Sequence, residues 1–165
     1  MTVLLLLPFL FPTVITAVAQ YVVLAPLGLV GTLPGILVGH TVVCLPYAFV
    51  IALGAVRALD PAHERAASSL GAGRTTVLWR VTLPGVRGAL AGAGVLCALV
   101  SFDEPVVALF LSGTDVRTLP VQTLGALTQG ADPTVGVMST VSILLAVAAG
   151  VTTVLRTAAP ERTSR

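Results

Sequence analysis

The sequence contains no lysine, and only 10% of its 165 residues are charged. Without lysine, the chain cannot bind ATP through a P-loop lysine or form a Schiff base with a carbonyl compound. So few charges also cannot cover the surface of a soluble domain, whereas 56% of the residues are hydrophobic and the mean hydropathy is +1.01. These absences favour an integral membrane protein.

The groups that usually carry chemistry are also scarce, with two cysteines and two histidines in all. Cys44 and Cys97 lie inside apolar runs, where thiols behave as small hydrophobic groups, and they predict no disulfide. His40 and Cys44 have the spacing of two ligands on one helix face, but no third ligand shares that face. We expect packing and a local hydrogen bond there, and no metal or other cofactor. Ser101 and Asp103 lack a nearby histidine and a nucleophile elbow, so we do not expect an enzyme.

Four apolar runs are long enough to cross a bilayer whose hydrocarbon core is about 30 Å thick. They cover residues 3–24, 33–56, 85–102 and 134–155. Because lipid offers no partner for a free backbone amide, each run is expected to be helical. The sequence predicts a single all-α transmembrane domain over residues 1–165, with about four membrane-spanning helices.

The nine arginines are distributed unevenly about these runs. Five lie between residues 57 and 87, one lies between the third and fourth runs, and three follow the fourth run. By the positive-inside tendency, segment 57–84 and the C-terminus are expected on the cytoplasmic side, and segment 113–133 on the other side. Orientation explains the basic side of the chain, and a nucleic-acid partner is not expected.

The cytoplasmic segment carries its own helix signals. Asp60 followed by Pro61 is a favourable helix start, and Gly71 suits the left-handed residue that closes a helix. A second short helix is expected from about residue 74 to residue 82, ending before Pro84. The pattern predicts a helix-turn-helix, and taken alone it fits a partner-binding surface and a well-capped interfacial loop equally well.

The stretch ERAASSLGAGRTTVLWRVTLPGVRG resembles the cytoplasmic EAA loop of ABC-importer permeases, whose pattern is roughly E-A-A, L-G-A and then V-T-L-P. The stretch GHTVVCLPYAFV before it, and SFDEPVVALFLSG, TLPV and DPTVGVMST after it, resemble the second permease subunit of spermidine/putrescine-type importers. The similarity runs in the family's order from residue 8 to residue 155. The chain is identified as a member of the MetI-like ABC permease family, which implies a helical bundle.

The resemblance implies that this loop docks into a groove of a cytoplasmic ATPase subunit. Arg65, Ala66 and Ala67 occupy the E-A-A triplet, so the triplet's acid is replaced by arginine and any salt bridge there falls to Glu64 or is lost. Gly88 also stands where the family often has proline. The implied docking residues are Glu64, Arg65, Ala66, Ala67, Leu70, Gly71, Ala72 and Gly73.

Residues 85–112 as one straight helix would be about 42 Å long, too long for the bilayer core without strong tilt. Asp103, Glu104 and Pro105 mark the expected break. A carboxylate at bilayer depth costs on the order of 2.5 to 3.5 kcal/mol, so we expect Asp103 and Glu104 to line an entry to the transport path, where a cation would fit. Plain solvation at the outer interface is the alternative.

The resemblance implies a permease subunit of an ATP-driven ABC importer in the bacterial inner membrane, for polyamines or a related small solute. Implied partners are cytoplasmic ABC ATPase subunits, a second permease subunit that is identical or different, an extracytoplasmic solute-binding protein and membrane lipid. Permeases for iron(III), phosphonate or opines are alternatives, as are an ATP-independent carrier and an inactive truncated remnant. Because the family has six core helices, two more helices are expected to precede Met1.

Overall fold

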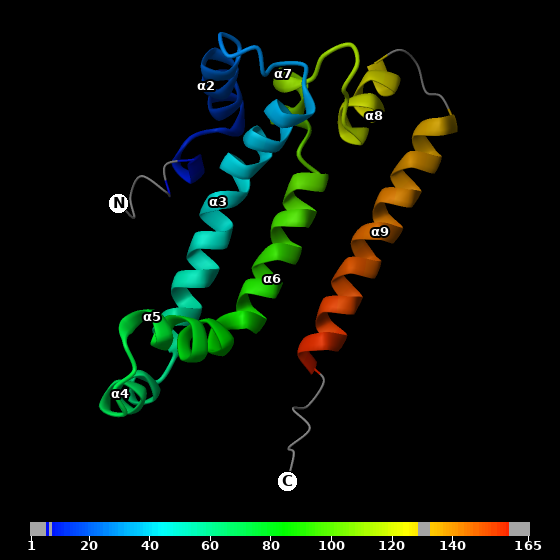
Figure 1. Cartoon of the computed structure of the whole chain (residues 1–165). Coiled ribbons are helices and arrows are strands. Elements are labelled where there is room, and N and C mark those ends of the chain that lie inside the picture. The colour runs from blue at the N-terminus through cyan, green and yellow to red at the C-terminus, as the bar shows by residue number, and fades with distance from the viewer. Residues whose placement is uncertain (1–5, 7, 129–132, 159–165) are drawn as a thin grey trace.

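The computed structural model describes residues 6, 8–128 and 133–158, and the elements within these ranges are all helices. Three long helices lie side by side (Figure 1): α3 (Leu33–Ala58), α6 (Leu83–Phe102) and α9 (Pro133–Ala158). The expected all-α fold is therefore confirmed for the described residues. The expected extracytoplasmic residues 129–132 and cytoplasmic residues 159–165 lie outside them.

Shorter helices gather at the two ends of this bundle (Figure 1). One end is formed by α2 (Thr13–Leu24), α7 (Pro105–Leu111) and α8 (Leu119–Thr128). The opposite end is formed by α4 (Pro61–Ser69) and α5 (Arg74–Val77). The segment expected to bind a partner is thus separated from α2, α7 and α8 by the length of the long helices.

Among the described residues, two helices are long and apolar enough to cross a membrane by length and composition, namely Leu33–Ala58 and Arg74–Phe102. The second consists of α5, a π-helical turn η1 (Leu78–Thr82) and α6. Thr13–Leu24 and Gly136–Thr152 are shorter apolar helices.

The first apolar run is not one helix. Residue 6 and residues 8–10 are helical, the chain bends at Phe11, and α2 starts only after Pro12. Pro12 has an extended backbone, with φ −53° and ψ 139°. Its ring cannot supply the amide hydrogen that a continuing helix needs. The helix expected over residues 3–24 is therefore interrupted, and residues 3–5 lie outside the described residues.

The second helix of the expected helix-turn-helix does not end at Pro84 but continues through η1 into α6. In a regular α-helix, the ring of Pro84 would meet the carbonyl of Arg80. Here the amide of Leu83 bonds to the carbonyl of Leu78, five residues back, and this wider turn accommodates the proline. Figure 1 shows the chain changing direction sharply between α5 and α6.

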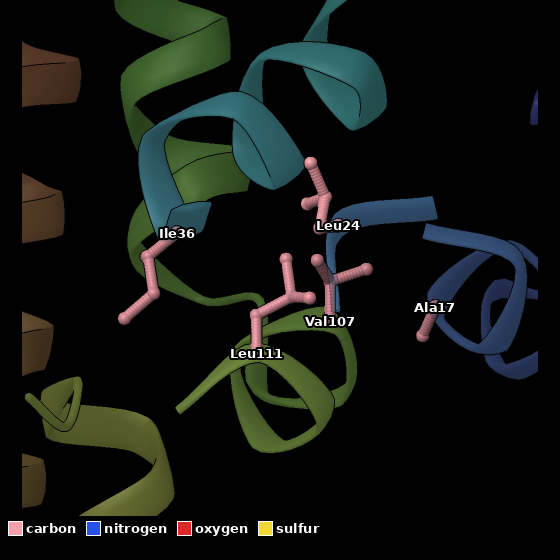
Figure 2. Close-up of a cluster of buried hydrophobic side chains, with 5 residues drawn as sticks. All are labelled: Ala17, Leu24, Ile36, Val107 and Leu111. Atoms are coloured by element: carbon pink, nitrogen blue, oxygen red, sulfur yellow. The ribbon is translucent and has the colours of Figure 1, made fainter. Parts of the chain in front are cut away.

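The buried apolar core lies at the end formed by α2, the start of α3 and α7 (Figure 2). Its members are Ala17, Leu24, Ile36, Val107 and Leu111. Gly39 faces the same contact, and a Cβ atom there would overlap the Leu111 side chain. The small residue therefore lets α7 pack directly on α3.

Polar side chains join α3 to the antiparallel α6. His40 Nδ1 lies 2.8 Å from Ser101 Oγ. The Cys44 thiol donates to the carbonyl of Cys97 at 3.3 Å, and the Cys97 thiol donates to the carbonyl of Cys44 at 3.5 Å. The expectation of a local hydrogen bond for His40 was wrong, because its partner lies 61 residues away in the sequence.

Candidate functional site

The start of α4 is fixed by the residues that predicted it. The Asp60 carboxylate accepts a hydrogen bond from the amide of Ala62 at 2.8 Å, and Pro61 occupies the first turn. The side chain thereby satisfies an amide that has no partner within the helix. The expected helix start is confirmed.

The turn after α4 depends on Gly71, whose φ of +84° lies in the left-handed region. The amide of Gly71 bonds to the carbonyl of Ser68 at 3.0 Å, and the amide of Ala72 bonds to the carbonyl of Ala67 at 3.1 Å. These two bonds form a Schellman motif, in which glycine avoids the steric cost of a Cβ atom. The predicted helix closure is confirmed.

A single side-chain hydrogen bond links α4 to η1. The Thr82 hydroxyl donates to the Glu64 carboxylate at 2.6 Å, across 18 residues of sequence. Thr82 is buried and Glu64 is half-buried. Because Thr82 lies in the π-helical turn that leads into α6, this bond ties the helix-turn-helix to a long apolar helix.

The structure divides the expected docking residues into two groups. Five are exposed: Arg65, Ala66, Leu70, Gly71 and Gly73. Three are half-buried: Glu64, Ala67 and Ala72. The large apolar side chain among them is that of Leu70, which is 89% exposed at the turn.

A pocket of about 380 Å³ that is open to the surroundings lies between α4, the turn after it, α5 and η1. Its lining residues are Glu64, Ser68, Ala72, Arg74, Val77, Leu78 and Thr82. The Glu64–Thr82 hydrogen bond therefore joins α4 and η1, the two helical segments that line opposite sides of this pocket.

The expected break after α6 is confirmed, and the two acids at the break belong to different helix ends. α6 ends at Phe102, and Asp103 follows as its exposed C-cap. The Glu104 carboxylate instead caps α7, where it accepts hydrogen bonds from the amides of Val106 at 2.8 Å and Val107 at 3.0 Å. From the sequence we expected the two acids to act as a pair, whereas the Glu104 carboxylate is already hydrogen-bonded to the backbone of α7.

Asp103 borders a cavity of about 360 Å³ between the α6–α7 break, α8 and α9. It is the charged residue of the lining, which otherwise consists of apolar side chains and three hydroxyl residues, Thr123, Ser139 and Ser142. A lining with an acid and no base is better suited to a cationic or neutral group than to an anion. An apolar pocket with a few polar groups is the usual form of a small-molecule site.

The sequence did not predict the hydrogen bond between His40 and Ser101, because no histidine lies near Ser101 along the chain. The missing signal is tertiary, because only the packing of α3 against α6 brings the two side chains together. His40 is buried and Ser101 half-buried between the two helices, and the bond serves to hold them together. Among the described residues, no group of three His, Cys, Asp or Glu side chains could hold a metal ion.

Comparison with known proteins identifies related sequences over nearly the whole chain. The family model described as "Binding-protein-dependent transport system inner membrane component" matches residues 1–163. The spermidine/putrescine transport system permease protein PotC of Haemophilus influenzae is 28% identical over 137 residues, which cover 83% of this chain and 53% of that protein.

Two further relatives differ in the solute that their names give. The putrescine transport system permease protein PotI of Escherichia coli is 32% identical over 101 residues, covering 61% of this chain and 36% of PotI. The molybdenum transport system permease protein ModB of Mycobacterium bovis is 31% identical over 134 residues, covering 72% of this chain and 51% of ModB. The chain spans about half the length of the PotC proteins it matches.

Proposed function

Since this chain belongs to the family of binding-protein-dependent transport system inner membrane components, we propose that it acts as a permease subunit of an ATP-driven importer. Its two long apolar helices agree with the family's membrane location. We place α4 and α5 on the cytoplasmic side and the chain in a multi-pass arrangement, because the arginines concentrate around residues 57–87. Permeases of this family are in general not enzymes, and ATP hydrolysis belongs to a separate subunit.

The observation that carries this proposal is the exposed helix-turn-helix between the two long apolar helices. α4 follows directly on α3, and α5 continues through η1 into α6. The Glu64–Thr82 hydrogen bond joins the two arms. An ATPase that docks on residues 65–73 can therefore move α3 and α6 together, because Glu64 bonds α4 to η1, as a rigid-body switch requires.

The importer would also contain a second ATPase, a second permease subunit that is identical or different, and an extracytoplasmic solute-binding protein. Exposed apolar side chains along α9 support contact with lipid or with a second subunit, for example those of Leu144, Leu145 and Val147. The binding protein would dock near α8, at the end opposite to α4.

Deletion of residues 61–73 tests the docking role. We expect the deletion to abolish co-purification of the ATPase from co-expressing cells, because it removes α4 and its turn. Leu70→Asp is a milder variant that leaves the buried contacts intact and should also reduce the retained ATPase. Undiminished co-purification with both variants would contradict the proposal, and Asp115→Asn at the opposite end serves as the matched control.

For the solute, we propose a polyamine or a related small cation. The names of PotC and PotI give polyamines as their solutes, and the cavity beside Asp103 carries an acid without a base. An ammonium group would contact Asp103 while its methylene chain lies along the apolar walls. Glu104 would contribute by capping α7 and so shaping this entrance.

Asp103→Asn tests this assignment, with labelled putrescine uptake as the measurement. We expect uptake to fall by about tenfold or more, because a charge-assisted hydrogen bond to the ammonium is lost. Asp115→Asn is the control, since Asp115 is also an exposed acid near that end but does not line the cavity. Equal uptake by the two variants would reject the role of Asp103.

A further inference from the structure

Both acids of segment 57–82, which runs from the end of α3 to the end of η1, accept hydrogen bonds from the protein's own backbone or side chains. Asp60 accepts the amide of Ala62, and Glu64 accepts the hydroxyl of Thr82. Each carboxylate is therefore already used within the fold. Glu64 is half-buried beside Thr82, whereas Asp60 is exposed and keeps its negative charge at the surface.

The arginines of the same segment have the opposite arrangement. The four are exposed: Arg57, Arg65, Arg74 and Arg80. Within the part of the chain that the structure describes, none of their guanidinium groups makes a hydrogen bond or an ion pair. Segment 57–82 carries four arginines and two acids, so its net charge is positive, and all four arginines are accessible.

Helix geometry explains why neighbouring residues Glu64 and Arg65 have such different environments. Successive residues on an α-helix point about 100° apart. Glu64 and Ser68 line the pocket on the inner side of α4, toward η1. The opposite side, which we name the α4 outer face, is exposed and consists of Ala62, Arg65, Ala66, Ser69 and Leu70.

We propose that the α4 outer face binds an acidic groove on the ATPase subunit, with Arg65 pairing with a carboxylate of that groove. Leu70 enters an apolar pocket beside it, and Glu64 stays bonded to Thr82 as an internal latch. This inference rests on the proposed function and adds the sign of the charge that the partner must carry. Charge complementarity selects such a partner, because a like charge facing Arg65 would be repelled. A guanidinium also pairs with a carboxylate through two parallel hydrogen bonds.

Two features favour a protein surface over anionic lipid headgroups. Ala62 and Ala66 flank Arg65 with small side chains, which permit close approach by a packed surface. Leu70 is 89% exposed at the turn, and α4 lies at the far end of α3 and α6 (Figure 1). Lipid headgroups offer charge but no apolar pocket for a leucine at that tip.

The test measures binding of the co-expressed ATPase, identified by its ATP hydrolysis and its mass, to the permease complex in nanodiscs. We expect Arg65→Glu to weaken binding by about tenfold or more, and Arg65→Lys to weaken it less, because lysine keeps the charge but not the paired hydrogen bonds. Raising the salt concentration should weaken binding of the unmodified protein and should have a smaller effect on Arg65→Gln. Glu64→Gln should stay within about threefold, since its amide oxygen can still accept the Thr82 hydroxyl.

Arg117→Glu is the matched control, because Arg117 is exposed at the opposite end. Unchanged ATPase binding by Arg65→Glu would overturn the inference, and so would a larger loss of binding with Glu64→Gln than with Arg65→Glu. In either case, ATPase binding by the unmodified protein would still support the proposed function. Failure of the unmodified protein to bind any ATPase would overturn the proposed function itself. A loss confined to nanodiscs with anionic lipid would assign Arg65 to headgroups and also overturn the inference.

Discussion

The two ends of the helical bundle are held together by different forces. At the end with α2 and α7, Ala17, Val107 and Leu111 are fully buried in an apolar cluster (Figure 2). At the opposite end, α4 has no buried residue and is linked to η1 by the Glu64–Thr82 hydrogen bond. One end is fixed by packing, whereas the other keeps most of its surface available for a partner.

This difference is clearest for two leucines. Leu111 is fully buried, whereas Leu70 is 89% exposed. Their chemistry is the same, so the difference lies in their surroundings: Leu111 contributes to the packed cluster, and Leu70 is free for the recognition role proposed above. The comparison indicates that apolar packing fixes the α2–α7 end, whereas the α4 end leaves a large apolar side chain at the surface, as the proposed docking requires.

The largest expected effect concerns these two leucines. Leu111→Ala should lower the free energy of unfolding by about 2 to 5 kcal/mol, because it leaves a cavity in a packed cluster. Leu70→Ala should leave stability unchanged and reduce ATPase binding instead. Thermal unfolding in nanodiscs and ATPase co-purification measure the two effects. Equal destabilisation by both substitutions would break the comparison.

Thr82→Val should lower stability at the α4 end by about 1 to 3 kcal/mol, because it leaves the Glu64 carboxylate without its donor. Thr82→Ser keeps the hydroxyl and should behave nearly as the unmodified protein does. Amide hydrogen exchange localises the effect, and we expect faster exchange in α4 but not in α2 or α7. Uniformly faster exchange would show that the two ends are not independent.

Gly71→Ala should cost about 1 kcal/mol, because alanine at a φ of +84° is strained although the surrounding space is open. Gly73→Ala is the matched control, since Gly73 has a φ of −70° and equally open surroundings. Hydrogen exchange at the turn should separate the two variants. Identical exchange in both would argue against a conformational role for Gly71.

The smallest expected effect is on the contact between α3 and α6. Ser101→Ala should cost about 0.6 kcal/mol, the mean value for side-chain hydrogen bonds between membrane helices. Ser69→Ala, in the exposed α4, is the control and should change stability less. Chemical unfolding curves of the two variants measure the difference, and a cost of several kcal/mol for Ser101→Ala would place His40 in a larger polar network.

Several local features could be predicted because their causes lie within a few residues. Asp60 and Pro61 start α4, and Gly71 closes it through bonds to residues of the same turn. Pro105 and the acids before it mark the break after α6. Each prediction needed only backbone preferences and short-range hydrogen bonds, which the amino-acid order specifies directly.

Two other predictions failed, one because of an unexpected local turn and one because the partner is distant in the sequence. Pro84 indicated a helix end, but the π-helical turn before it lets the helix continue. His40 was expected to bond locally, but the packing of α3 on α6 gives it Ser101. At Pro84 the usual preference was offset by a change of backbone hydrogen bonding within one turn, and at His40 by the packing of two helices.

The sequence by itself determined that this chain is a set of apolar helices with one capped, small-residue helix-turn-helix between two of them. Only the tertiary structure decided that Glu64 turns inward to Thr82, that Arg65 faces outward, and that Asp103 and Glu104 have different surroundings. The physical reason is that residue types fix local conformation and burial tendency. The direction of a side chain, and the group it meets, depend on how the helices are placed against one another.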